Sequence, residues 1–185
     1  MSKIVNTPLT DEVVKDLKAG ERVLLNGIIY TGRDAAHKRI SELISKGKDL
    51  PMDIHNQIIY YVGPCPAKPG QAIGSAGPTT SGRMDAYAPL LMEHGLKGMI
   101  GKGIRNQQVV DSIIKYNCVY FGAIGGAGAL LAEAIKEAEV IAFQDLGAEA
   151  IYKLKVENFP VTVIVDNQGN DLYKIGKEHF LLYNE

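Results

Sequence analysis

The sequence predicts a mixed α/β fold, a core of strands connected by helices. Runs of β-branched and apolar residues alternate along the chain with segments whose apolar residues recur at helical spacing. Helices between strands are typical of crossover connections, which parallel strands require. The chain has 185 residues, of which 46% are hydrophobic, and it contains no repeat and no linker. We therefore expect a single domain, residues 1–185, with a substantial core.

Each element follows from its local pattern. Thr10 is a suitable N-cap and Glu12 a first-turn charge, so a short helix is expected over 9–17. Apolar residues at helical spacing predict further helices. These cover residues 33–46, 84–94, 107–116 and 129–138. Extended apolar runs predict strands over residues 21–29, 57–62, 97–100, 119–124, 140–143 and 160–165.

Two segments are expected to lack long regular structure. Residues 63–82 form a loop, because prolines and glycines interrupt any periodicity there. Near the end, the Asn167–Gly169 turn predicts a hairpin that joins the strand at 160–165 to a short strand near 172–173.

Composition excludes several classes of function. The 20 Lys and Arg nearly balance the 21 Asp and Glu, so the chain lacks the basic excess that nucleic acids or anionic membranes would need. Cys65 and Cys118 are far apart, which argues against a disulfide framework and gives too few thiols for a zinc or iron–sulfur site. The polar N-terminus and the short apolar stretches indicate a soluble protein. We expect a cytoplasmic location.

The segment Gly77–Asp85, GPTTSGRMD, has the composition of an anion site. Thr79, Thr80 and Ser81 offer hydroxyls, and Thr80 or Ser81 could cap a helix that begins near Gly82. Exposed N–H groups at a helix start, beside the planar fork of Arg83, suit a carboxylate or a phosphate. The alternative is a capped helix after a turn, with Arg83 as a surface charge.

Two other segments could complete an anionic pocket. Arg33 lies at a predicted helix start in TGRDAAHKR, and Lys102 lies between two glycines directly after a predicted strand. The alternatives are an ordinary capped helix with a solvated basic face, and a simple turn with an exposed lysine. The glycines of Gly122–Gly128 do not match a dinucleotide-binding spacing, and close strand–helix packing explains them better.

Five segments resemble, in order, the β region of class I, iron–sulfur-dependent fumarases and L(+)-tartrate dehydratases. The resemblance extends from about Leu25 to Tyr173, and GPCPAKPG and GPTTSGRMD are its most specific parts. The five segments are TGRDAAHKR, IYYVGPCPAKPGQAIGSAGPTTSGRMDAY, GLKGMIGKG, YFGAIGGAGALLA and FPVTVIVDNQGNDLY.

The resemblance implies a domain of the swivelling β/β/α type, with a mixed sheet or barrel-like core and surrounding helices. It also implies that this chain is the β subunit of a two-component hydro-lyase that hydrates fumarate reversibly to L-malate. In the family, a four-iron–four-sulfur cluster is held by three cysteines of an α subunit. This chain lacks such cysteines, so we expect the cluster on a partner, an active site between the subunits, and an α2β2 assembly with a β–β contact.

The resemblance also assigns roles to residues. Arg33, Arg83 and Lys102 are expected to bind the substrate carboxylates, and Thr80 to bind the substrate as well. Thr79 and Lys102 are expected to be catalytic, with Thr79 as the base and Thr80 as the fallback. Arg83 is a candidate stabiliser of a Thr79 alkoxide, and Asp34 and His37 are expected to orient Arg33. Two alternatives stay open: the β subunit of L(+)-tartrate dehydratase, which acts on another dicarboxylate, and a noncatalytic anion-binding or assembly domain.

Overall fold

The core of the molecule is a closed, barrel-like sheet. The structure, a computed structural model, describes the backbone of residues 2–182 and the side chains of residues 2–177. The strand order is β1-β2-β3-β4-β5-β7-β6, and an additional pairing of β7 with β2 closes five strands into a ring. This arrangement confirms the expected mixed sheet with a barrel-like core and surrounding helices.

The described strands are β1 (Lys3–Asn6), β2 (Arg22–Thr31), β3 (Ile58–Tyr60), β4 (Gly98–Gly101), β5 (Val119–Gly122), β6 (Ile135–Ala142) and β7 (Ile151–Val165). The described α-helices are α1 (Asp11–Lys15), α2 (Asp34–Ser45), α3 (Ala88–Glu93), α4 (Gln107–Tyr116), α5 (Gly128–Glu133) and α6 (Leu172–Leu182). Two 3-10 helices, η1 (Ser81–Met84) and η2 (Gln144–Glu149), lie in the connections.

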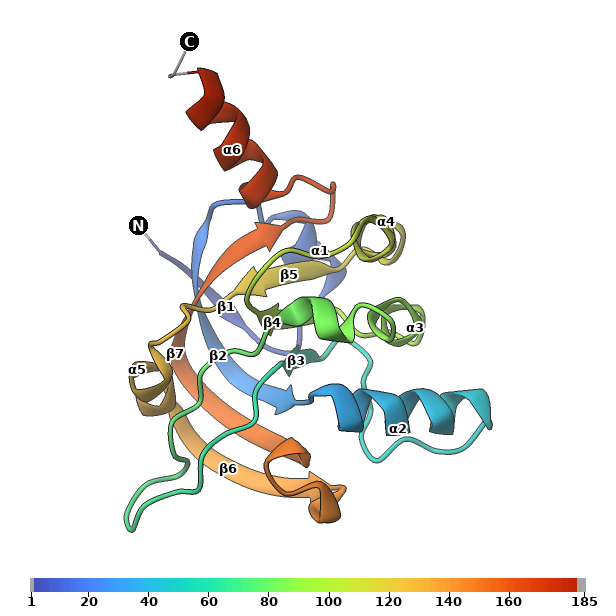
Figure 1. The fold of residues 1–185 in the computed structure, drawn as a ribbon, viewed down its shortest axis with the longest axis vertical. Helices are drawn as coiled ribbons and strands as arrows, with labels where there is room; N and C mark the ends of the chain where they lie inside the picture. Colours follow the sequence, from blue (N-terminus) through green and yellow to red (C-terminus); the bar gives the residue numbers. More distant parts are fainter. Residues whose placement is uncertain (1, 183–185) are drawn as a thin grey trace.

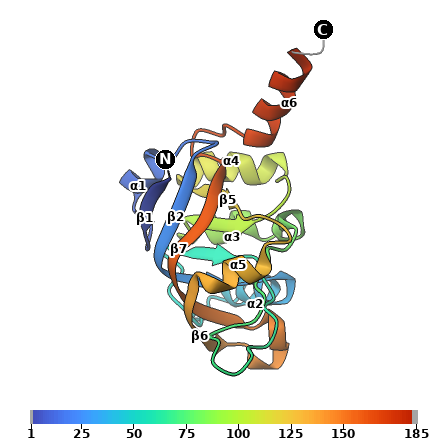
Figure 2. The same cartoon turned by 90° about the vertical axis from the view of Figure 1, so that its left-hand side faces the viewer.

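Strands β1 to β5 run parallel, and β7 returns antiparallel between β5 and β2. The crossovers between β2, β3, β4 and β5 contain α2, α3 and α4, which lie on the same side of the strands in Figure 1. Helix α5 lies on the other side, and Figures 1 and 2 show α6 projecting from one end of the molecule. The parallel order places the carboxyl ends of β2 to β5 at one edge of the sheet.

Alternation along the strands separates two apolar layers. Along β3 and at the residue after it, Ile58 and Tyr60 point into the barrel, while Ile59 and Tyr61 face the layer of helices α2, α3 and α4. On β5, Phe121 points inward and Tyr120 outward. Every one of these six side chains is at most 1% exposed, so the parallel strands are buried on both faces, as parallel strands usually are.

Most of the predicted elements are confirmed. The helix predicted over residues 107–116 matches α4, and the Thr10 hydroxyl accepts a hydrogen bond from the Val13 N–H at the start of α1, as an N-cap does. Residues 63–82 are a loop apart from the start of η1. No helix in the described part of the chain is long and apolar enough to cross a membrane.

Three predictions near the C-terminal half are wrong. The helix predicted over 129–138 ends at Glu133, and β6 follows from Ile135, because pairing with β7 outweighs the helix propensity of its Lys, Glu and Ala residues. Strand β7 begins nine residues before the predicted start at Pro160. No strand forms near 172–173: a single bridge joins Val165 to Asp171, and α6 begins at Leu172.

The helix predicted over 84–94 is also shorter than expected. The structure has the 3-10 turn η1 and then α3, which begins at Ala88 with Pro89 in its first turn. Proline lacks an N–H and is tolerated only in the first turn of a helix, so α3 cannot extend upstream as far as Met84.

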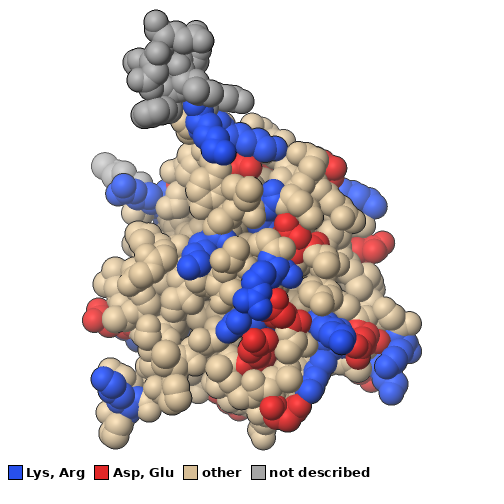
Figure 3. Space-filling model, in the orientation of Figure 1, with Lys and Arg blue, Asp and Glu red and all other residues tan. Residues whose placement is uncertain are grey.

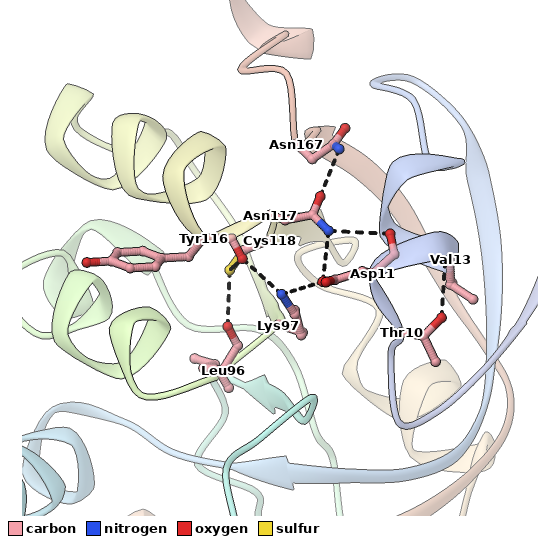
Figure 4. A network of polar contacts seen from close by, with 9 residues as sticks. All are labelled: Thr10, Asp11, Val13, Leu96, Lys97, Tyr116, Asn117, Cys118 and Asn167. Carbon is pink, nitrogen blue, oxygen red and sulfur yellow. Dashed lines mark hydrogen bonds and ion pairs between the residues drawn. The ribbon is translucent and has the colours of Figure 1, made fainter.

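A polar network joins the elements at the amino ends of β4 and β5 (Figure 4). The Lys97 ammonium lies 2.7 Å from Asp11 Oδ1 and donates to the Tyr116 carbonyl at 2.9 Å. Asn117 also donates to Asp11 Oδ1, at 2.9 Å, and accepts from Asn167 at 2.9 Å. These contacts link α1 to the end of α4, at the opposite end of β4 from Lys102.

Candidate functional site

The carboxyl ends of the parallel strands bring two of the predicted cations next to backbone from neighbouring strands. A Cβ placed on Gly63, after β3, would lie 2.7 Å from the Nη1 atom of Arg33, which follows β2. A Cβ placed on Gly125, after β5, would lie 3.9 Å from the Lys102 Nζ, which follows β4. Glycine at position 63 therefore leaves room for Arg33, whereas a Cβ at position 125 would be in ordinary contact with Lys102.

The threonines of GPTTSGRMD lie against Lys102 through backbone pairing. The Lys102 N–H donates to the Thr79 carbonyl at 3.2 Å, and the Ser81 N–H donates to the Lys102 carbonyl at 2.8 Å. Thr80 lies between these bonds in a parallel bridge with Lys102, and the Thr79 N–H is held by the Tyr61 carbonyl at 2.7 Å. The structure thus brings Thr79, Thr80 and Lys102 together.

Arg83 reaches from η1 to the start of α2. Its Nε donates to Asp34 Oδ1 at 3.0 Å, and the Arg83 side chain is 53% exposed. Asp34 is the residue next to Arg33, so both predicted arginines lie at the β2–α2 junction. The Arg33 guanidinium pairs with Glu149 of η2, with 3.3 Å between Nη2 and Oε1.

Two local interpretations from the sequence, the role of Asp34 and the cap of a helix near Gly82, are corrected, and the start of α2 proves to be occupied. Asp34 holds Arg83 rather than Arg33. The start of α2 is not open, because Glu149 accepts a hydrogen bond from the Ala35 N–H at 3.1 Å. Neither hydroxyl of Thr80 or Ser81 caps a helix: Thr80 makes no capping bond at η1, and the Ser81 hydroxyl pairs with that of Tyr120 at 2.9 Å.

Sequence reasoning missed a buried ion pair beneath these loops. The Arg105 Nε donates to Asp85 Oδ1 at 2.6 Å, and the Arg105 guanidinium lies over the rings of Tyr61 and Tyr120 at 5.4 and 4.9 Å. Glu149 was also missed. The position of Asp85 within the motif GPTTSGRMD was the only signal in the sequence that could have pointed to the ion pair. The partners of Asp85 and of Glu149 are too far away in the sequence to be identified from a local pattern.

Comparison with known proteins decides the family. The family model described as "Fumarase C-terminus" matches residues 2–176. The chain belongs to the fumarase C-terminus family. Two relatives carry fumarase names: the anaerobic class I fumarate hydratase of Escherichia coli is 48% identical over 155 residues, and fumarate hydratase 2 of Leishmania major is 45% identical over 156.

These fumarase C-terminus relatives differ in how much of their length the chain covers. The matches include 83% of this chain but only 28% of each of the two fumarate hydratases. A Methanocaldococcus jannaschii protein, provisionally named as the subunit beta of L(+)-tartrate dehydratase, is 39% identical over 184 residues. That match covers 96% of this chain and 94% of the relative. The named relatives are therefore hydro-lyases or subunits of them.

The described residues of this fumarase C-terminus chain do not supply the ligand set for an iron–sulfur cluster. They contain no group of three or more His, Cys, Asp or Glu side chains placed to hold a metal ion. Cys65 is exposed in the loop after β3, whereas Cys118 is buried, and its thiol lies 3.1 Å from the Leu96 carbonyl. Burial raises the pKa of Cys118 to about 12, which disfavours the thiolate that a metal needs.

Charges at the surface are mixed. On the face shown in Figure 3, Lys and Arg side chains alternate with Asp and Glu, and no patch of a single sign covers it. The pairs Arg83–Asp34 and Arg33–Glu149 follow the same rule at the candidate site. These pairs nearly cancel the charges of the two arginines. Any anion selectivity of this site therefore depends on Lys102 and on the N–H donors that each arginine keeps free.

Several buried polar atoms around the site have no hydrogen-bond partner among the described residues. Seven buried side-chain atoms lack a hydrogen-bond partner among the described residues, and five of them belong to side chains beside the site. Such atoms are rare in folded proteins, so these five are polar groups that the described residues leave unsatisfied. The five atoms are Arg33 Nε, Asp34 Oδ2, His37 Nε2, Tyr61 Oη and Arg105 Nη2.

His37 gives the site a pH-dependent stability. Its Nδ1 lies 2.9 Å from the Arg33 carbonyl, which can only accept, so Nδ1 carries a proton. Burial lowers the pKa of His37 from its ordinary value of 6.5 to about 4, so the ring is neutral at pH 7. In the unfolded chain the ring binds a proton near its ordinary pKa, so the free energy of unfolding falls as the pH drops from that value towards the folded one.

We expect the wild-type chain to lose about 2 kcal/mol of unfolding free energy through His37 between about pH 7 and about pH 5. Urea unfolding of the wild type and of His37→Gln at both pH values measures this contribution, because glutamine does not titrate. The variant should lose less stability than the wild type by that amount. Equal losses in the two proteins would show that His37 is not held neutral in the folded state.

Proposed function

We propose that this chain, residues 1–185 acting as one domain, is the β subunit of a class I fumarate hydratase that converts fumarate and L-malate reversibly. In this proposal the four-iron–four-sulfur cluster belongs to an α subunit, with which the chain forms an α2β2 assembly in the cytoplasm. The observation that carries the proposal is the clustering of Thr79, Thr80 and Lys102 by backbone pairing, close to strand ends that also position Arg33. Membership of the fumarase C-terminus family supports the choice of reaction.

The cations of the site suit a dicarboxylate. Each guanidinium has five N–H donors, and the contacts to Asp34 and Glu149 engage only part of each set. Arg83 therefore keeps its terminal N–H groups for a substrate carboxylate, and Asp34 holds the side chain in a defined orientation. Arg33 would bind in the same region, and Lys102 would add a single charge from the end of β4.

The reaction also needs a base and a group that stabilises negative charge. Dehydration of malate removes a proton from the carbon next to the one that bears the hydroxyl, and charge then develops on the adjacent carboxylate. Thr79 is our candidate for the proton acceptor, and Arg33, Arg83 and Lys102 for stabilising that carboxylate. A threonine is a weak base unless a neighbouring cation stabilises its alkoxide. Lys102, whose backbone pairs with that of Thr79, is our candidate for that cation, since Asp34 engages the Nε of Arg83.

A second candidate function has one specific observation in its favour. The Methanocaldococcus jannaschii relative, whose name refers to L(+)-tartrate dehydratase, matches over 94% of its own length, whereas the Escherichia coli fumarate hydratase matches over 28%. A separate β subunit of this size is thus compatible with tartrate dehydration. Tartrate and malate both present two carboxylates to the same cationic set, so the residues of this chain do not separate them.

Anaerobic purification of the chain with its cluster-bearing partner, followed by assays with fumarate, L-malate and L(+)-tartrate, tests the proposal. We expect the complex to interconvert fumarate and L-malate, and the isolated chain to show neither activity nor iron absorbance. Faster turnover of L(+)-tartrate than of L-malate would favour the tartrate dehydratase. A complex inactive on all three substrates would favour a noncatalytic anion-binding or assembly domain, and activity of the isolated chain would refute the two-component arrangement.

A further inference from the structure

A buried pair of hydroxyls connects the two loops that carry the candidate catalytic residues. Tyr120 on β5 and Ser81 at the start of η1 are both 0% exposed, and their hydroxyl oxygens lie 2.9 Å apart. The Tyr120 hydroxyl also lies 2.8 Å from the Gly103 carbonyl. A carbonyl can only accept, so Tyr120 donates to Gly103 and accepts from Ser81. One hydroxyl therefore joins the Thr79–Ser81 segment to the turn after Lys102.

The surroundings leave this pair little freedom to rearrange. A Cβ placed on Gly101 would lie 2.0 Å from the Ser81 Oγ, so the Ser81 side chain fits against a position where only glycine leaves room. The Tyr120 ring is covered by the Arg105 guanidinium, which Asp85 holds through a 2.6 Å hydrogen bond. Burial also raises the pKa of Tyr120, which keeps its hydroxyl protonated and able to donate.

We propose that Tyr120 is a positioning residue of the hydratase site, an inference that rests on the function proposed above. Its hydroxyl holds Thr79 and Thr80 in place against Lys102. The backbone alone fixes the segment at three points: the Thr79 N–H bonds to Tyr61, and the Thr79 carbonyl and the Ser81 N–H bond to Lys102. The side-chain connection adds a fourth point, which ties the Ser81 end of the segment to β5 and to the turn after Lys102. Catalysis needs this precision because a displacement of about 1 Å can cost about a hundredfold in rate.

Tyr120→Phe in the assembled complex tests the proposal, because it removes the hydroxyl and keeps the ring beneath Arg105. We expect kcat to fall by about 10- to 100-fold while KM changes by less than about threefold, since the carboxylate-binding arginines are untouched. Ser81→Ala breaks the same connection from the other side. The double variant should lose no more kcat than the larger single loss, because both changes remove one interaction.

Two further measurements separate positioning from a general loss of stability. Lys97→Met removes the Lys97–Asp11 ion pair at the opposite end of β4, so it should lower stability and leave kcat near that of the wild type. Amide hydrogen exchange in the full chain should become faster at Ser81 and Lys102 in Tyr120→Phe and stay unchanged there in Lys97→Met.

Each of these measurements can support or overturn the positioning role of Tyr120. Wild-type kcat in Tyr120→Phe, or an equal loss of kcat in Lys97→Met, would overturn the positioning role. If the wild-type complex hydrates no dicarboxylate, the proposed function fails, and amide exchange alone then judges the connection between the loops. Faster exchange at Ser81 and Lys102 would support it, and unchanged exchange would overturn it.

Discussion

Replacing Thr79 with valine should lower the kcat of the assembled enzyme by about 10²- to 10⁴-fold, the usual contribution of a positioned general base. Valine keeps the branched shape and removes only the hydroxyl, and the backbone bonds from Thr79 to Tyr61 and Lys102 need no side chain. The expected change is therefore chemical rather than structural. Steady-state kinetics with L-malate measures it, with the Tm of each variant recorded alongside.

Two variants serve as controls for Thr79→Val. Thr79→Ser retains a hydroxyl and should recover most of the lost kcat. Thr80→Val removes the hydroxyl of the neighbouring residue, which also pairs with Lys102, and should have a smaller effect. If Thr80→Val suffers the large loss and Thr79→Val does not, the base is Thr80. If both variants keep wild-type rates, neither threonine takes the proton.

Arg83→Ala should reduce kcat/KM by about 30-fold to a few thousandfold. This corresponds to a loss of about 2–5 kcal/mol of transition-state stabilisation. The physical reason is that a substrate carboxylate enclosed at the site would lose its paired cation and stay desolvated. Arg83→Lys keeps the charge but cannot contact Asp34 and a carboxylate with one planar group, so its loss should be intermediate. Initial rates at substrate concentrations below KM give the ratio directly.

Arg39→Ala is the matched control for Arg83→Ala. Arg39 also pairs with an aspartate, since its guanidinium binds Asp145 through two hydrogen bonds of 2.7 and 2.5 Å, but it lies further along α2. An exposed ion pair contributes little to stability, so kcat/KM should stay close to the wild-type value. Equal losses in both variants would mean that Arg83 acts on the fold and not on the substrate.

Local patterns predicted much of the fold because they describe interactions between residues close in sequence. The Thr10 cap and the apolar spacing of α4 depend on neighbours within about one or two helical turns. The Lys, Glu and Ala residues of β6 favour a helix, so the sequence predicts a helix over part of this segment. Pairing with β7, which comes later in the chain, makes the segment a strand instead. The secondary structure of this segment therefore depends on a strand that is distant in sequence, and its own residues do not determine it.

The same division holds at the candidate site. The motifs of the sequence determined the family and named Arg33, Thr79, Thr80, Arg83 and Lys102 as residues of interest, since family likeness lies in the order of residue types. Only the tertiary structure decided which side chains hold them. Asp34 binds Arg83, Glu149 occupies the start of α2, and Tyr120 connects two loops. These contacts join residues that lie between 17 and 114 positions apart, so only the packing of strands and connections in the folded chain brings them within hydrogen-bonding distance.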